Sequence, residues 1–431
     1  MWRIFYHLFR AITGVSLWMH RRFTRAGLLA VCALVLTAVF GVDTSLTVAY
    51  QIFTFLAALL AIALISAGFG RTPLAVQALM PRTLTAGEPF SLRFSVRNTS
   101  DAALDGAALR AELSDPRPAF AEFRSVLTYP TYGGWLRLVA GNRIADLEEI
   151  PVPALVARGA TESEARGRAR RRGRLQSRSI DSARSEALGL MRKLMPAAGS
   201  ADIYVLPKRY PLPMLTLPGT RRNQPGGLPQ GSSVGDSEEF LGLRDYRPGD
   251  PLQRIHWRSF ARTGKPVVKE YQDEFVARHA LILDTHAGEG AVAVEAFEEA
   301  VAVAASFAWT IDTQDCLLDL MFVGGEVHTF TAGHGYLLPE HLLEVLAGVA
   351  MKAEDDFQML ADAVRGRREQ LSGCVCILLR WDERRRVLLD ALRASGASVL
   401  PLLIAAQAPQ SVPPGVRVLH PGRIAEGLAG L

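Results

Sequence analysis

Residues 235–274 read GDSEEFLGLRDYRPGDPLQRIHWRSFARTGKPVVKEYQDE, and they combine charges, aromatic rings and turn-forming residues more densely than any other stretch of the chain. They carry seven Lys or Arg against eight Asp or Glu, so the two signs nearly cancel. Such a balance favours internal ion pairs over attraction to one strongly charged partner. We expect the neighbouring domains to be arranged around this stretch.

The middle of this stretch predicts one short helix. Asp250 is placed to cap its first turn, Pro251 suits its first position and Gly264 marks its end. Such a helix has an arginine face with spacing i, i+4, i+8 and an apolar face. The arginine face comprises Arg254, Arg258 and Arg262, and the other face Leu252, Ile255, Ser259 and Phe260. Residues 247–250 predict a tight turn before the helix, and residues 266–271 a strand after it.

Two interpretations compete for the polar residues of this stretch. In one, its arginines pair with Glu238, Glu239, Asp245 or Glu270 and clamp the segment onto its domain. In the other, the arginine face docks an acidic patch of a partner, with Trp257 as an aromatic anchor. The residues assigned to one or other role are Arg244, Tyr246, Arg247, Asp250, Arg254, His256, Trp257, Arg258 and Arg262.

Asp250, His256 and Ser259 could also form a hydrolytic triad. However, the sequence around Ser259 has no strained nucleophile turn, and no oxyanion site is evident. A structural histidine bonded to a carboxylate or to the backbone is the simpler interpretation of His256. We therefore expect no catalytic residue here.

Composition sets further bounds. A chain of 431 residues can hold two or three domains. Its 49% hydrophobic content is high for a soluble protein, so a membrane segment is sought first. A net charge of +5 is modest for this length and does not favour a nucleic-acid partner. The four cysteines have neither disulfide-framework nor zinc spacing, which indicates a reducing compartment.

The first seventy residues predict a membrane hairpin. Residues 1–25 are basic with no acid, and residues 26–70 contain the apolar runs 27–42 and 46–69. A cleavable signal peptide is the alternative for the first run. Because basic flanks stay cytoplasmic, the arginines before the first run and Arg71 after the second predict that both chain ends face the cytoplasm of an inner-membrane protein.

Residues 71–208 predict an antiparallel, immunoglobulin-like β-sandwich. Its expected strands are 74–80, 89–98, 107–113 and 203–206, and its expected turns are 133–134 and 141–142. Within it, residues 166–178 (RGRARRRGRLQSR) hold seven arginines. Three interpretations of this run compete: a solvated strand face, a patch attracted to the anionic inner leaflet, and a nucleic-acid site. The absence of interleaved aromatic rings disfavours the nucleic-acid site.

Residues 209–275 contain a Pro- and Gly-rich connector followed by the opening stretch, and residues 276–431 alternate strands with helices. The expected strands are 280–283, 316–323, 326–331, 375–381, 398–404 and 416–419, and the expected helices are 292–311, 338–351, 357–371 and 383–395. This alternation predicts an α/β domain of the open Rossmann type with a mostly parallel sheet. No glycine-rich phosphate loop follows its first strand.

Together these segments resemble the domain-of-unknown-function 58 family. The family pattern GEF-GLREYRPGD-RRIHW-ASARTG-L-VREF-E is similar to residues 239–250, 254–264 and 268–271 of this chain. The resemblance implies paired membrane helices, a β-sandwich with an RRGR segment and a C-terminal domain like that of von Willebrand factor A. It also implies a MoxR-type AAA+ ATPase as partner, since members of the family are often encoded beside one.

Two positions depart from the family pattern. Where the family often has Asp-Pro-Phe-Gly-Leu after its RRGR strand, residues 186–190 read EALGL, so the turn is expected to persist without its proline. Where a von Willebrand A domain holds Mg²⁺ with Asp-x-Ser-x-Ser, residues 284–288 read DTHAG. His286 and Gly288 replace both hydroxyls, so we expect a degenerate site at Asp284 and no metal or other cofactor.

The sequence therefore predicts a non-enzymatic, membrane-anchored adaptor that presents a client or a membrane complex to the ATPase. The expected partners are the MoxR-type ATPase, the lipid bilayer and other membrane-associated proteins, without nucleic acid. The alternative is a metal-dependent ligand-binding module of the von Willebrand A type. A hydrolase using His256 is the third hypothesis.

Overall fold

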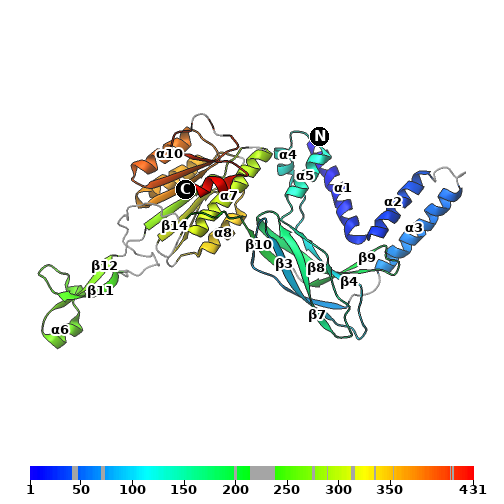
Figure 1. The fold of residues 1–431 in the computed structure, drawn as a ribbon, viewed down its shortest axis with the longest axis horizontal. Coiled ribbons are helices and arrows are strands. Elements are labelled where there is room, and N and C mark those ends of the chain that lie inside the picture. Colours follow the sequence, from blue (N-terminus) through cyan, green and yellow to red (C-terminus); the bar gives the residue numbers. More distant parts are fainter. Residues whose placement is uncertain are drawn as a thin grey trace. The chain divides into compact units, whose positions relative to one another are not determined.

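The computed structural model describes residues 1–40, 47–68, 73–198, 201–213, 238–273, 277–288, 290–311, 316–333, 336–352, 354–407, 409 and 412–431. Within them the chain forms two compact units, Met1–Lys208 and Arg209–Leu431 (Figure 1). The predicted multidomain organisation is confirmed at this level. Each unit is built around its own sheets.

Three helices open the first unit: α1 (Trp2–Arg22), α2 (Arg25–Phe40) and α3 (Thr47–Gly68). Of the described helices, one is long and apolar enough to cross a bilayer, over Val48–Gly68, and the apolar part of α2, Arg25–Val39, is shorter. The predicted pair of spanning helices is therefore supported for one of its two members. The loop predicted at residues 43–45 and the flank at Arg71 lie outside the described residues.

Two mainly antiparallel sheets follow. One has the order β1-β3-β7-β5, and the other the order β2-β10-β8-β4-β6 with β9 paired to β8. The strands are β1 (Leu74–Leu79), β2 (Thr83–Thr85), β3 (Pro89–Asn98), β4 (Ala107–Leu113), β5 (Ala145–Leu147), β6 (Ile150–Pro151), β7 (Ala160–Ala169), β8 (Gly173–Ser185), β9 (Arg192–Ala198) and β10 (Ala201–Leu206). Buried side chains alternate along β3 and β7, and both sheets contribute to one hydrophobic core. The strands predicted at 89–98 and 107–113 are confirmed.

The turn predicted at residues 133–134 is wrong, because this stretch is helical. Helices α4 (Phe120–Val126) and α5 (Tyr132–Gly141) form here, and the turn predicted at residues 141–142 is the end of α5. The hydroxyl of Thr131 caps α5 by accepting a hydrogen bond from Gly134 N at 3.2 Å. Trp135 is fully buried, so packing outweighs the low helix propensity of the two glycines.

The second unit contains a six-stranded sheet in the order β15-β14-β13-β16-β17-β18, parallel except for β15. Its strands are β13 (Ala277–Leu283), β14 (Cys316–Val323), β15 (Val327–Ala332), β16 (Gly373–Leu378), β17 (Ser398–Ile404) and β18 (Arg417–Leu419). Its helices are α7 (Ala291–Thr310), α8 (Pro339–Gly348), α9 (Phe357–Arg367), α10 (Glu383–Ala394) and α11 (Ile424–Ala429). β16 is buried along its whole length, as expected of a central parallel strand. The predicted alternation of strands and helices is confirmed.

The opening stretch forms a separate two-stranded antiparallel sheet, β11 (Glu238–Asp245) with β12 (Val267–Asp273). Between them lie a 3₁₀ turn, Leu252–Arg254, and helix α6 (Trp257–Thr263). The single helix predicted from Asp250 is wrong. Ile255 is extended, buried and bridged to Val268, so the backbone leaves the helical path there. Gly264, at φ 69°, ends α6 as predicted.

Candidate functional site

The signature segment is fastened by one arginine–carboxylate pair. Arg244 donates from both terminal nitrogens to Asp250, at 2.7 and 2.8 Å, and the backbone N–H of Arg247 donates to the same carboxylate at 2.9 Å. These hydrogen bonds, that from Arg244 foremost, lower the pKa of Asp250 to about 2. Asp250 therefore closes the turn before α6, instead of capping a helix as predicted.

Helix α6 presents aromatic and basic side chains to solvent. The rings of Trp257 and Phe260 meet edge to face at 6.0 Å, and the two residues are 61% and 38% exposed. Arg258 and Arg262 on the same helix are also exposed. We call Trp257, Arg258, Phe260 and Arg262 the signature surface. Exposed aromatic rings beside arginines are enriched at the centres of protein–protein interfaces.

The other predicted residues of this segment have structural contacts. Tyr246 N donates to Pro266 O at 3.1 Å, which joins the ends of β11 and β12. Arg247 is exposed and Arg254 is half-buried. Of the four carboxylates predicted to pair with these arginines, Asp245 is exposed, and the side chains of Glu238, Glu239 and Glu270 lie outside the described part of the structure.

His256 and Ser259 are in direct contact. The imidazole Nδ1 lies 2.7 Å from the Ser259 hydroxyl, and His256 N donates to Val267 O at 2.8 Å. The hydroxyl differs from the carboxylate or backbone partner predicted for the ring. Asp250, the third member of the hypothetical triad, is bonded to Arg244 and the Arg247 N–H. The contact is thus a serine–histidine pair at the start of α6.

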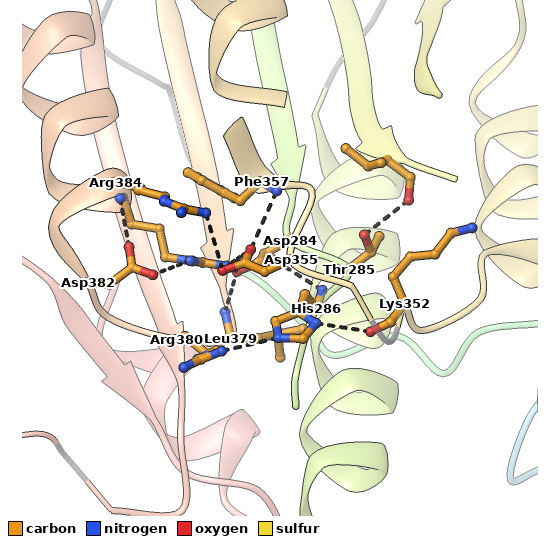
Figure 2. Close-up of polar contacts among 12 residues, drawn as sticks. Asp284, Thr285, His286, Lys352, Asp355, Phe357, Leu379, Arg380, Asp382 and Arg384 are labelled. Atoms are coloured by element: carbon orange, nitrogen blue, oxygen red, sulfur yellow. Dashed lines mark hydrogen bonds and ion pairs between the residues drawn. The ribbon is translucent and has the colours of Figure 1, made fainter. Parts of the chain in front are cut away.

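A second cluster lies at the carboxyl edge of the six-stranded sheet. Along the chain, β14 and β15 are added on one side of β13, and β16, β17 and β18 are added on its other side. In open α/β sheets, ligands bind in the crevice at such a switch point. Asp284 follows β13, and Arg380 lies two residues after the end of β16. Figure 2 shows the two loops facing each other, with Asp355 and Asp382 beside them.

At the centre of this cluster is an arginine that is not among the predicted site residues. Arg385 is fully buried, and its guanidinium lies 2.7 Å from the Asp284 carboxylate, which also accepts from Arg385 Nε at 2.8 Å. It contacts two further carboxylates, Asp355 at 3.3 Å and Asp382, and it lies 4.3 Å above the Phe357 ring. We call Asp284, Asp355, Asp382 and Arg385 the sheet-edge cluster.

A sequence signal for Arg385 does exist. Asp382 caps α10 by accepting from Arg385 N at 3.0 Å, so the guanidinium belongs to the first turn of that helix. A cation is unfavourable at that end of the helix dipole unless carboxylates surround it. An arginine three residues after an aspartate cap therefore indicates a charged neighbourhood.

The charge states follow from this geometry. Burial raises the pKa of Asp284, against the lowering effects of the Arg385 guanidinium and the N–H groups of His286 and Leu379. Burial alone would lower the pKa of Arg385, but the three carboxylates raise it above its ordinary value. The guanidinium thus stays charged in the interior.

The Mg²⁺ expected of a von Willebrand A site does not fit these residues. Both oxygens of Asp284 accept hydrogen bonds, one from His286 N at 3.1 Å and the other from Arg385 and Leu379 N. Thr285 Oγ1 donates to Val323 O at 3.0 Å. Among the described residues, no group of three or more His, Cys, Asp or Glu is arranged to hold a metal ion.

Both ring nitrogens of His286 contact neighbouring loops. Its Nε2 lies 3.1 Å from Arg380 Nη1, which can only donate, so Nε2 accepts. Its Nδ1 lies 3.1 Å from Lys352 O, which can only accept, so Nδ1 carries the proton (Figure 2). The ring therefore links three loops at the sheet edge.

The basic run 166–178 lies at the end of β7, in the turn that follows and in β8. Its members make ion pairs and hydrogen bonds within the first unit: Arg168 with Gly87 O, Arg170 with Asp146, Arg171 with Asn142 and Arg174 with Asp202. These contacts favour the solvated strand face among the three interpretations.

Comparison with known proteins adds a family. Residues 242–388 match the family model described as "Protein of unknown function DUF58". The chain carries a DUF58 region. It is also similar to the "Uncharacterized protein YeaD" of Bacillus subtilis (strain 168), with 26% identity over 148 residues, which cover 34% of this chain. The match spans about a third, 36%, of that relative's own length.

Solved structures add no argument about the fold of this chain. The CARDB domain of PF1109 from Pyrococcus furiosus is 11% identical, covering 31% of this chain and 92% of that one, with a TM-score of 0.18. Salmonella alpha-2-macroglobulin is 17% identical, covering 34% of this chain and 8% of that one, also with a TM-score of 0.18. Scores this low do not establish a shared fold.

Proposed function

We propose that this DUF58 protein is a non-enzymatic, membrane-anchored adaptor, and that the signature surface binds a MoxR-type AAA+ ATPase. The observation that carries the proposal is the exposed Trp257–Phe260 pair on a helix that also exposes Arg258 and Arg262. An aromatic anchor beside two arginines suits an acidic protein surface. The α/β domain is, on this proposal, a von Willebrand A-like module, and the two sheets of the first unit form an immunoglobulin-like sandwich.

The anchor is proposed to be α3 together with α2, in the inner membrane. Thr24, just before α2, and Ser66, near the end of α3, both bond to residues 186–190. The two helices therefore begin and end at the same place on the first unit. This supports a membrane hairpin with both chain ends in the cytoplasm. A C-terminal reporter that works only in the periplasm would contradict it.

The adaptor proposal is tested by co-purification from membranes, with and without nucleotide. Trp257→Ala should lower recovery of the ATPase at least about tenfold, since a central aromatic anchor contributes about 2 kcal/mol or more. Stability should change by less than about 0.5 kcal/mol, because the side chain is mostly exposed. Trp309→Ala removes another half-exposed indole and is the matched control. Failure to recover any AAA+ ATPase with the unmodified chain would overturn the proposal.

Charge is tested separately. Arg258→Glu should abolish crosslinking of the ATPase in membranes, because it reverses an exposed charge on the signature surface. Arg166→Glu reverses an exposed arginine on β7 and should leave crosslinking unchanged. Equal losses in the two variants would mean that net charge, and not this surface, controls association.

A hydrolase is the second candidate, favoured by the 2.7 Å contact between His256 and Ser259. It requires covalent labelling of Ser259 by a fluorophosphonate probe and loss of that labelling in His256→Ala with the fold intact. The metal-dependent alternative requires Mg²⁺ binding that Asp284→Ala abolishes, measured by calorimetry. Neither result is expected if the adaptor proposal is right.

A further inference from the structure

Helix α1 has two apolar faces on opposite sides. Its inner face, Tyr6, Phe9 and Thr13, is buried against Phe123 and Trp135 of α4 and α5. The contact is a dense aromatic cluster, and Trp135 Nε1 donates to Thr13 Oγ1 at 2.7 Å. The inner face therefore fixes α1 on its own domain.

The outer face of α1 is a continuous apolar stripe. Ile4, Leu8, Ile12, Val15 and Trp18 recur at helical spacing and are 71%, 49%, 44%, 58% and 50% exposed. A stripe of five large apolar side chains in water is unfavourable, and such a surface marks a contact with a partner or a membrane. The question is which occupant covers it.

The charge beside the stripe identifies the occupant. Residues 1–40 contain five arginines and no Asp or Glu. At 100° per residue, Arg3, Arg10 and Arg21 align along one flank of the outer face. They also touch the rest of the first unit, so the flank lies along the border between protein and stripe. Arg3 lies over the Phe120 ring, Arg10 lies 3.8 Å from Asp115, and Arg21 pairs with Asp181. A basic flank beside Leu, Ile and Trp is typical of helices that lie in an anionic membrane interface.

The position of α1 agrees with this occupant. Phe23 and Thr24, directly after α1, bind the turn at residues 186–191, where Phe23 bridges Met191 and Thr24 N donates to Leu190 O at 2.9 Å. The end of α3 meets the same turn, through Ser66 to Glu186 at 3.3 Å. The C-terminal ends of α1 and of the candidate spanning helix α3 thus contact the same turn. Figure 1 shows α1 and α2 diverging from that junction.

We propose that α1 lies in the headgroup region of an anionic bilayer, with its outer face inserted and its inner face holding the first unit against the membrane. This rests on the proposed membrane anchor and adds to it a second, surface-bound element. Trp18 lies on the outer face near the C-terminal end of α1, and its amphipathic ring favours the membrane–water interface. The excess of positive charge in residues 1–40 attracts the anionic headgroups.

The test uses the full chain in lipid nanodiscs. An environment-sensitive fluorophore is attached at Leu8→Cys in a Cys32→Ser background, because Cys32 is exposed and the other three cysteines are buried. In discs with anionic lipid we expect a blue shift of the emission and its loss on quenching by brominated lipids. The matched control is the same label at Ser91→Cys, an exposed position on β3, which should show neither.

A second variant changes the stripe itself. Ile12→Glu places a charge on the exposed face and should remove both the blue shift and the quenching at position 8, whereas Ile12→Leu should preserve them. If the label at position 8 stays as polar and unquenched as that at position 91 while the chain remains in the disc, the inference is overturned and the anchor stands. If the chain does not enter discs, the anchor fails. Crosslinking between two copies through position 8 would instead assign the stripe to a second copy.

Discussion

Two arginine–aspartate pairs in the second unit use the same chemistry in opposite environments. Arg244 and Asp250 of the signature segment retain 34% and 16% side-chain exposure, whereas Arg385 and Asp284 of the sheet-edge cluster retain 0% and 2%. A surface pair is screened and contributes little to stability, but breaking a buried pair leaves an uncompensated charge in the interior. The first pair therefore shapes a loop, and the second is part of the core.

The largest effect is expected at the buried pair. Arg385→Ala should destabilise the chain by about 3–5 kcal/mol, because it leaves the buried Asp284 without its cation. Denaturant unfolding measures the change. The neighbouring Arg386→Ala is the control, since Arg386 pairs with Glu383 at the surface and its loss should leave the free energy of unfolding nearly unchanged. Equal costs for the two variants would remove the distinction.

A smaller effect is expected at the exposed pair. Arg244→Ala should change overall stability by less than about 1 kcal/mol. It should nevertheless accelerate hydrogen exchange at Arg247, whose N–H is tied to Asp250, while amides of β16 keep their protection. Arg244→Lys keeps the charge but loses the paired hydrogen bonds. Its exchange rate at Arg247 should lie between those of the unmodified chain and of Arg244→Ala. Faster exchange in β16 as well would show that the two regions open together.

The finest distinction is in the response to pH. The pKa of Asp250 is about 2, below its ordinary 3.8. Its ionised carboxylate therefore stabilises the folded state above about pH 4, and this stabilisation is lost as the pH falls through about 2. The pKa of Asp284 is raised, so its pH dependence has the opposite sign. Its contribution to stability is present below pH 3.8, the ordinary pKa, and is lost as the pH rises through the pKa of the folded state. Acidification should therefore open the signature segment before the sheet edge.

Hydrogen exchange corrected for its intrinsic pH dependence measures this order. Asp250→Asn is the control, because it removes the titrating group and should abolish the acid-induced opening of the turn at residues 247–250. Opening of the sheet edge first on acidification would contradict the assigned directions.

The strands of both units could be predicted because apolar side chains recur along them with the period of a strand or in short buried runs. Residues 89–98 and 316–323 are examples where the predicted and observed limits agree. Helix α5 could not be predicted, because its two glycines signal a turn and its stability comes from burying Trp135 under α1, a contact distant in sequence. Local propensity carries no information about such a partner.

The same reason explains the errors at the candidate sites. Capping residues at 250 and 264 predicted one helix, but Ile255 is pulled out of it by its bridge to Val268. At the sheet edge, the loss of the two hydroxyls after Asp284 was visible in the sequence, whereas the arginine that occupies its carboxylate lies a hundred residues later. Such a buried pair forms because the strand order brings the two residues together. The hydrophobic pattern of the sequence does not predict that order.

The guanidinium at the sheet edge has a consequence for how the domain is assembled in the cell. Its positive charge is encoded in the polypeptide, so it is present as soon as the chain is synthesised and needs no loading step. A chelator cannot withdraw it, and changes in the cellular concentration of divalent cations do not alter its occupancy. The buried Asp284 carboxylate therefore has its counter-ion as soon as the domain has folded.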